Sequence, residues 1–205
     1  MTDHLVATMA QLEAMYAKPL ETPLLKEIDR IGPHYRALIE AAPFCALATC
    51  GPEGLDCSPR GDAPGFVRVA DAKTLMIPDR RGNNRIDSLR NIVRDSRVAL
   101  LFLIPGVAET MRVNGRAAIS TEPALLESFT VDGKAPRCVI VVTVERAYFQ
   151  CAKAIVRSKL WDPATRIERS KLPSTGAMVA AITQGKVDAA TYDREAPARI
   201  KAHLY

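Results

Sequence analysis

The chain has 205 residues, of which 48% are hydrophobic and 25% are charged. This length suits one domain, and no apolar run approaches the ~18 residues of a membrane-spanning helix. The formal charge of +5 permits an anionic partner, but it is concentrated, because residues 80–97 hold six arginines and two aspartates. With few aromatic residues and no polybasic tail, this distribution favours a local phosphate site over a nucleic-acid-binding face.

The sequence also argues against export and against a metal centre. The N-terminus lacks the basic and long apolar segments of a signal peptide, so we expect a cytoplasmic protein. The number of cysteines is odd and no CxxC occurs, so neither a disulfide framework nor a zinc site is expected. The histidines at positions 4, 34 and 203 have no partner at ligand spacing, which disfavours a metal site and an axial haem ligand.

The first 42 residues are predicted to form packing helices. Apolar residues recur at helical spacing over 5–16, and Gly32-Pro33 starts a second helix that ends at Pro43. Neither segment carries residues with an obvious chemical role.

Short apolar segments separated by tight turns follow, and they indicate an antiparallel sheet rather than a parallel one. Strands are predicted at 44–49, 55–59, 66–69, 74–78, 98–105, 110–120 and 138–148. The run at 98–105 has no polar residue, so we expect it to be buried on both faces, and Gly115 is expected to introduce a bulge into the next strand. A six-stranded antiparallel barrel with flanking helices accounts for these segments.

Helices are predicted within and after the barrel. Apolar residues from Ile86 to Val93 mark one side of a helix, for which Asn83 or Asn84 is the expected N-cap. Further helices are expected at 121–129, 151–160, 175–186 and 188–202. The last is polar on most sides and could cover a neighbouring subunit. We therefore expect one α+β domain, with helices in 1–42, the barrel in 43–150 and helices in 151–205.

The stretch from Pro78 to Arg85 (PDRRGNNR) lies where a strand is followed by the start of a helix. Unpaired backbone N–H groups and the helix dipole favour an anion at such a place, and guanidinium groups add bidentate donors. The combination predicts a site for a phosphate monoester. The alternative is a solvated charged loop, in which Arg60 simply pairs with Asp62 or Asp79.

Three motifs occur in order: Ser58 to Asp62 (SPRGD), Pro78 to Arg85, and Glu109 to Gly115 (ETMRVNG). Together they resemble the pyridoxamine 5′-phosphate oxidase-like family of FMN-binding split barrels. The block from Cys151 to Trp161 is similar to that of a functionally uncharacterised subgroup of the family. The resemblance covers about residues 33–165. It implies a homodimer with two FMN molecules at the subunit interface.

The resemblance also implies roles for individual residues. It assigns the phosphate of FMN to Arg60, Arg80, Arg81, Asn84 and Arg85. Backbone groups of Ile77, Pro78 and Asp79 would lie along the isoalloxazine ring, Thr110 would add a polar contact, and Arg112 is a candidate to stabilise the reduced flavin. The chain departs from the oxidases, because Pro78-Asp79 and Asn84-Arg85 replace their Tyr-Thr and Ser-Arg-Lys patterns. Pyridoxamine phosphate is therefore not the expected substrate.

Lys153, Arg157 and Trp161 are spaced by four residues on a predicted helix. One face then offers two cations and an indole, which suits an anionic or planar substrate beside the flavin. The alternative is a tryptophan packed on the barrel beneath the stems of the two cations. Cys151 lies at the start of the same helix and is either a reactive thiol or a merely buried or capping one.

Two classes of function follow from these features. The first is an FMN-dependent oxidoreductase acting on a small substrate, in which the cofactor carries the redox chemistry and no catalytic side chain is assigned. The alternative is a non-catalytic carrier or sensor of FMN or haem, and a weaker third interpretation is a barrel that binds RNA or DNA. No Ser–His–Asp set, paired-carboxylate site or phosphate-binding Walker motif can be placed in the sequence.

Overall fold

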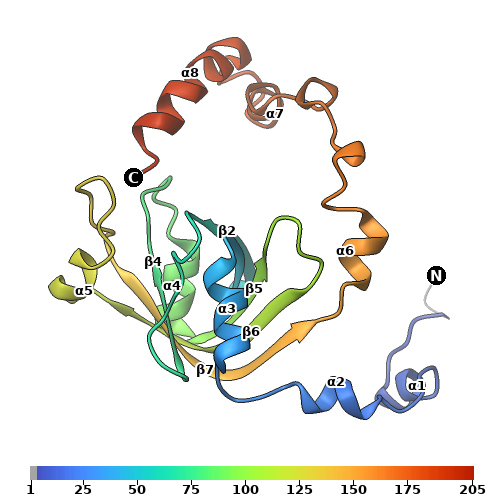
Figure 1. Cartoon of the computed structure of the whole chain (residues 1–205). Helices are drawn as coiled ribbons and strands as arrows, with labels where there is room; N and C mark the ends of the chain where they lie inside the picture. Colours follow the sequence, from blue (N-terminus) through green and yellow to red (C-terminus); the bar gives the residue numbers. More distant parts are fainter. Residues whose placement is uncertain (1–3) are drawn as a thin grey trace.

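The computed structural model describes residues 4–205 and shows a strongly curved antiparallel sheet with helices around it (Figure 1). The strands are β1 (Phe44–Gly51), β2 (Gly54–Gly61), β3 (Arg68–Val69), β4 (Thr74–Pro78), β5 (Arg97–Leu103), β6 (Thr110–Ser120) and β7 (Val139–Gln150). The helices are α1 (Met9–Glu13), α2 (Glu21–Leu25), α3 (Pro33–Ala41), α4 (Asp87–Arg94), α5 (Pro123–Glu127), α6 (Lys153–Ser158), α7 (Thr175–Ile182) and α8 (Ala189–Ala202). Within 4–205, no helix is both long enough and apolar enough to cross a membrane.

The strand order in the sheet is β2-β1-β5-β6-β7-β4-β3, and every neighbouring pair is antiparallel. The sheet has seven strands, whereas a six-stranded barrel was expected. Each of the seven predicted segments corresponds to one strand, and the segment 66–69 gives only the two-residue strand Arg68–Val69, which pairs with β4. This order puts β2 and β3 at the two edges. The split α+β barrel is confirmed, and the chain segments that leave β2 and β4 meet across its opening.

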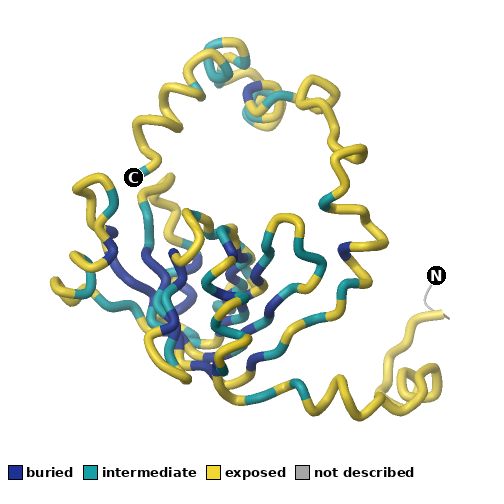
Figure 2. Tube along the Cα trace, viewed as in Figure 1, coloured by how far each residue is buried: buried dark blue, intermediate teal, exposed yellow. Residues whose placement is uncertain are grey.

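The core is formed by side chains that alternate along the strands (Figure 2). Leu47, Phe102 and Val113 are fully or almost fully buried, and Ile39 of α3 and Ile92 of α4 pack against them from outside the sheet. Burying each such side chain contributes about 1.5–3 kcal/mol to stability. The sheet is therefore rigid where it supports the loops at its opening.

The expectation that β5 is buried on both faces was wrong. Val98, Leu100 and Phe102 point into the core, but the intervening Leu101 is 36% exposed. Alternate side chains of a strand point to opposite faces, and the second face of β5 lies on the outside of the barrel. Composition alone did not reveal this, because Leu101 is as apolar as its buried neighbours.

The predicted bulge in β6 is confirmed. The register with β7 shifts between Asn114 and Gly115, and a Cβ atom at Gly115 would collide with the carbonyl oxygen of Thr143. Only glycine permits this close approach of the two backbones. The bulge lets one long β6–β7 ladder continue on both sides of the irregularity.

The N-terminal helices differ from their prediction. Only Met9–Glu13 of the segment 5–16 is helical, and its apolar residues Leu5, Met9 and Tyr16 are exposed rather than packed. The helix α2 was not predicted. By contrast, α3 begins with Pro33 in its first turn as expected and packs on the sheet.

The residues after β7 form an arm that arches away from the barrel and returns to it (Figure 1). The three predicted helices are present as α6, α7 and α8, and α7 packs on α8. Most of the arm is exposed, and α8 contains no buried residue (Figure 2). At its end the arm lies beside the segments that follow β2 and β4, where Tyr205 contacts Asp62.

Candidate functional site

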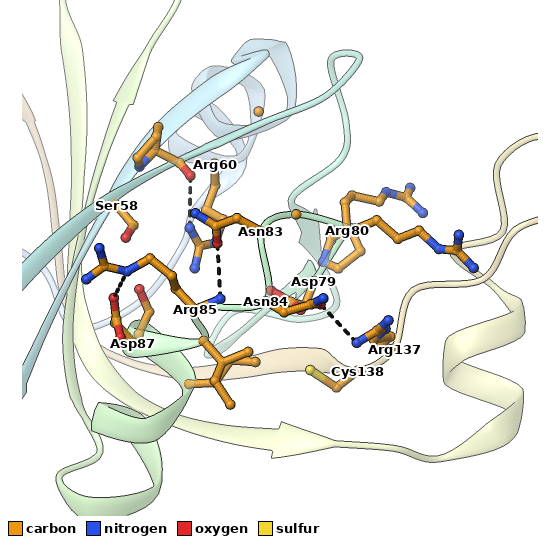
Figure 3. Close-up of a pocket in the computed structure, with 18 of the residues that line it drawn as sticks. Ser58, Arg60, Asp79, Arg80, Asn83, Asn84, Arg85, Asp87, Arg137 and Cys138 are labelled. Atoms are coloured by element: carbon orange, nitrogen blue, oxygen red, sulfur yellow. Dashed lines mark hydrogen bonds and ion pairs between the residues drawn. The ribbon is translucent and has the colours of Figure 1, made fainter. Parts of the chain in front are cut away.

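A cavity of about 650 Å³ lies at the opening of the barrel, between β2 and the segment that follows β4 (Figure 3). Its charged lining consists of five arginines and three aspartates, namely Arg60, Arg80, Arg81, Arg85, Arg137, Asp56, Asp79 and Asp87. The first turn of α4 forms one wall and has no side-chain cap. Arginine side chains and uncapped helix N–H groups together attract an anion.

Most of the residues predicted to bind FMN come together in this cavity. Seven of the ten line it: Arg60, Pro78, Asp79, Arg80, Arg81, Asn84 and Arg85. Ile77 immediately precedes them but is fully buried in the core. The remaining two, Thr110 and Arg112, lie elsewhere.

Arg60 extends from β2 toward the loop at Asn83 (Figure 3). Its Nη1 donates a hydrogen bond of 2.9 Å to the carbonyl oxygen of Pro59, whereas its buried Nε has no hydrogen-bond partner among the described residues. The proposed pairing with Asp62 or Asp79 is not formed. Leaving a buried donor without an acceptor costs about 1–3 kcal/mol, so the folded protein does not compensate for the burial of this nitrogen.

Arg80 connects two other segments of the barrel through its side chain. Its Nε is 2.9 Å from Oδ2 of Asp62, and its Nη1 donates to the carbonyl oxygen of Phe129 at 2.7 Å. The two charged side chains are only 16% and 6% exposed. Arg80 therefore ties the end of β2 to the loop after α5, and it retains one amino group for a ligand.

The loop between Asn83 and Asp87 has an unusual backbone. Asn84 and Ile86 have φ angles of 61° and 52°, in the left-handed region, which a β-branched residue such as isoleucine rarely adopts. Neither asparagine caps α4, so that prediction was wrong. Asn83 instead accepts the backbone N–H of Arg85 at 3.1 Å, and Ile86 occupies the N-cap position. Strained backbone of this kind is concentrated at functional sites.

Arg81 and Arg85 are the more accessible cations. Arg85 lies 2.8 Å from Asp87 through its Nε, and its side chain is 75% exposed. Such an exposed pair contributes little and can exchange for a ligand. Arg81 has no ion-pair partner among residues 4–205.

Arg137 belongs to the site but was not predicted. It donates a hydrogen bond of 3.1 Å to Oδ1 of Asn84, from the loop that precedes β7 (Figure 3). It reaches the cavity because β7 pairs with β4 at Val139 and Pro78. No local motif surrounds Arg137, so only the pairing of distant strands could have identified it.

Asp79 and Cys138 form the inner wall. Burial raises the pKa of Asp79, and the nearby guanidinium groups of Arg60 and Arg137 offset this only in part. Burial also raises the pKa of the Cys138 thiol to about 11, with a further contribution from Asp79. The backbone N–H of Asp79 donates to the carbonyl oxygen of Cys138 at 2.9 Å, which fixes the two residues side by side.

The predicted substrate wall is not at this cavity. Thr110 pairs with Gln150 at one end of β7, whereas Pro78 pairs with Val139 at the other. Arg112 lies over the ring of Tyr148, with its Cζ 5.2 Å from the ring centroid. Thr110 and Arg112, with Lys153 and Arg157 of α6, are therefore on the opposite side of the barrel from β4 (Figure 1).

Trp161 is attached to the barrel by a hydrogen bond. Its indole Nε1 donates a hydrogen bond of 2.7 Å to the carbonyl oxygen of Val107, in the loop between β5 and β6. Cys151 is exposed just before α6. Neither residue contacts the cavity at the barrel opening.

Comparison with solved structures finds several similar chains. HupZ of Group A Streptococcus is 22% identical, with a TM-score of 0.48, over 58% of this chain and 93% of that chain. General stress protein 26 of Bacillus anthracis is 14% identical, with a TM-score of 0.43, over 57% and 91%. A protein named F420 reductase is 19% identical, with a TM-score of 0.42, over 58% and 98%. These values support no conclusion about function.

A search of curated protein sequences finds no match. The sequence model of the family described as pyridoxamine 5′-phosphate oxidase, however, matches residues 31–151. This range runs from the start of α3 to the end of β7 and contains the whole barrel, the arginine-lined cavity and more than half of the chain. The protein therefore belongs to the pyridoxamine 5′-phosphate oxidase family.

Proposed function

We propose that the protein binds FMN, with the phosphate in the arginine-lined cavity, and that it is a flavin-dependent oxidoreductase acting on a small substrate. The observation that carries this proposal is the cluster of five arginines that line one cavity. A phosphate oxygen would accept charge-assisted hydrogen bonds from their guanidinium groups, and such bonds are stronger than neutral ones.

The cavity fits a phosphate monoester in its charge and in its donors. Arg60, Arg85 and Arg137 would hold the phosphate, while Arg80 keeps the loop in place through Asp62. The carboxylate of Asp56 already accepts hydrogen bonds from Ser58 and Ser88, at 3.1 and 2.8 Å, and so competes less for the arginines. Bound FMN would supply a ring that accepts and donates electron pairs, and the protein would bind and orient it.

A second copy of the chain would complete the site. Thr110 and Arg112 pair with Gln150 and Tyr148, at the end of β7 away from Val139 and the cavity, and Lys153 follows β7 in α6. We infer that they contact the flavin held by the partner chain. This separation supports the proposal of a homodimer in which each flavin contacts both subunits.

The proposal is tested by the absorption spectrum of the purified protein with and without added FMN, followed by identification of the flavin released on denaturation. We expect a flavin band near about 450 nm and the release of FMN rather than FAD. Arg60→Ala should weaken FMN binding by about one to two decades, while Arg60→Lys should recover part of the loss. A wild-type protein that takes up no FMN at micromolar concentration would exclude the proposal.

Reduction of the bound flavin distinguishes an enzyme from a non-catalytic carrier or sensor. If NADH or NADPH reduces the bound flavin and an added acceptor reoxidises it, the protein turns over. Flavin that binds tightly but resists both steps would leave a carrier or sensor of FMN.

A further inference from the structure

The last residues of the arm, 199–205, are latched onto the barrel by one carboxylate. The hydroxyl of Tyr205 donates a hydrogen bond of 2.7 Å to Oδ1 of Asp62, whose Oδ2 is paired with Arg80. The Cζ of Arg80 lies 5.5 Å from the centroid of the Tyr205 ring. The side chain of Asp62 is 6% exposed, so the arm ends on a largely buried ionic contact.

Beside this contact lies a second, open cavity of about 490 Å³, which we call the tail pocket. It lies between residues 199–205 and the loop Arg80–Asn83. The same loop lines the arginine-lined cavity described above, so the two cavities are neighbours that share this loop. Arg60 lines only the phosphate cavity and Arg199 only the tail pocket.

The tail pocket is positive and has an apolar wall. Three arginines line it, and its one carboxylate, that of Asp62, is already occupied by Arg80 and Tyr205. Arg81 and Arg199 have no ion-pair partner within 4–205, and Arg199 is held over the ring of Tyr192 at 4.4 Å. Ile200 and Leu204 line the same pocket and are 63% and 60% exposed, which leaves their surfaces free for contact.

We propose that the tail pocket binds a small organic anion, with its carboxylate or phosphate between Arg81 and Arg199 and its apolar body against Ile200 and Leu204. Guanidinium groups from two segments form a bidentate clamp for such a group, and the aliphatic side chains accept the rest of the molecule. The proposal does not depend on FMN, because Arg199, Ile200 and Leu204 line the tail pocket alone, although Arg81 lines both cavities.

The first test uses phenyl phosphate and benzoate as probes and neutral benzyl alcohol as the control, with binding to the full chain measured by calorimetry in the presence of FMN. We expect at least one of the two anions to bind saturably and benzyl alcohol to bind more weakly. Arg199→Ala should weaken anion binding about tenfold, whereas Arg166→Ala, which removes an arginine elsewhere on the arm, should leave it unchanged.

The two sites are distinguished by measuring the binding of both ligands, FMN and the anion, to each of two variants. Arg60→Ala should weaken FMN but not the anion, and Arg199→Ala should weaken the anion but not FMN. Failure of FMN alone to bind would contradict the proposed function and leave the tail pocket standing. Equal losses in the Arg199 and Arg166 variants, or no saturation by either anion up to about 10 mM, would overturn the tail pocket.

The latch gives an independent test. Tyr205→Phe removes only the hydroxyl that contacts Asp62, and Tyr16→Phe removes the hydroxyl of an exposed tyrosine far along the chain. We expect the first variant to weaken anion binding several-fold and to speed amide hydrogen exchange in residues 199–205, and the second to do neither. Unchanged exchange and unchanged affinity in Tyr205→Phe would show that the pocket does not depend on the latch and would contradict the proposal as stated.

Discussion

The indole nitrogen of Trp161 lies 2.7 Å from the carbonyl oxygen of Val107, so the first turn of the arm is fastened to the loop between β5 and β6. Nearby Ile155 of α6 is buried as well. The arm thus touches the barrel at its beginning, through Trp161, and at its end, through Tyr205. Between the two contacts it makes its own small helix pair.

Trp161→Phe should lower stability without affecting the cofactor site. The substitution keeps an aromatic ring but removes the donor to Val107, so we expect the free energy of unfolding to fall by about 1 kcal/mol. Urea denaturation followed by circular dichroism measures this change. FMN affinity serves as the control, and a large loss of affinity at unchanged stability would favour the substrate-wall interpretation of Trp161.

Arg137→Ala should weaken FMN binding by about tenfold, because it removes a cation from the phosphate cavity and frees Asn84. Fluorescence titration of FMN measures the change. Arg166→Ala again provides a matched loss of charge outside the cavity and should bind FMN normally. If both variants titrate alike, Arg137 has no part in phosphate binding.

Asp79→Asn should stabilise the protein near neutral pH. The pKa of Asp79 is raised in the folded protein by burial, so folding favours the protonated carboxyl and the ionised form at pH 7 is a cost. The neutral amide removes this cost. The stability difference between variant and wild type should shrink as the pH falls through the folded pKa, and it should vanish below the unfolded pKa near 3.8, where both side chains are neutral.

Denaturation curves at several pH values test the sign of this prediction. A second readout is FMN affinity at pH 7, which should rise in Asp79→Asn because one negative charge leaves the phosphate cavity. A variant that is less stable than the wild type at pH 7 would mean that the electrostatic attraction of Arg60 and Arg137 for the Asp79 carboxylate outweighs the effect of burial.

Gly115→Ala should be strongly destabilising, because its Cβ would overlap the backbone oxygen of Thr143. The strands β6 and β7 would have to separate at the bulge, and we expect a loss of at least about 2 kcal/mol. Gly32→Ala is the matched control, since a Cβ at Gly32 meets nothing within 4 Å. Thermal unfolding of the two variants should differ clearly, and equal melting temperatures would contradict the assigned bulge.

Four of the five thiols should react in two groups. Burial raises the pKa of Cys45 to about 12 and that of Cys138 to about 11, whereas Cys57 and Cys151 are exposed. A thiol of pKa 11 is only about 0.1% thiolate at pH 8, against roughly a quarter for an ordinary cysteine. Mass spectrometry after iodoacetamide treatment should find Cys57 and Cys151 modified in the native protein, and Cys45 and Cys138 only after denaturation.

The order of the strands and most of the residues of the arginine-lined cavity were predictable from the sequence. Turn residues and apolar alternation are local signals, and they identified every strand and the start of the arginine loop. The failures concern contacts between distant segments. Asn83 or Asn84 was expected to cap α4, but Ile86, with its left-handed backbone, occupies the N-cap position. Arg137 was missed because its neighbour Asn84 lies 53 residues away in the sequence.

The sequence likewise did not reveal that Thr110 and Arg112 lie far from the cavity. Their motif follows the arginine loop in the sequence, yet the long β6–β7 ladder carries it to the other end of the barrel. The positions of these residues relative to Pro78 depend on strand lengths and register. No pattern within either motif encodes those distances.

The pairing of β4 with β7 also bears on the order in which the molecule acquires its structure. Pro78 and Val139 are about sixty residues apart, whereas β1 meets β2 through a tight turn and β5 meets β6 through a short loop. Local hairpins form early, and contacts between remote segments form late. Arg80, Arg81 and Arg85 follow β4, and Arg137 precedes β7. The arginine-lined cavity should therefore form only in the last steps of folding, when β4 pairs with β7. A folding intermediate without the β4–β7 pairing would contain much of the hydrophobic core but would not bind its ligand.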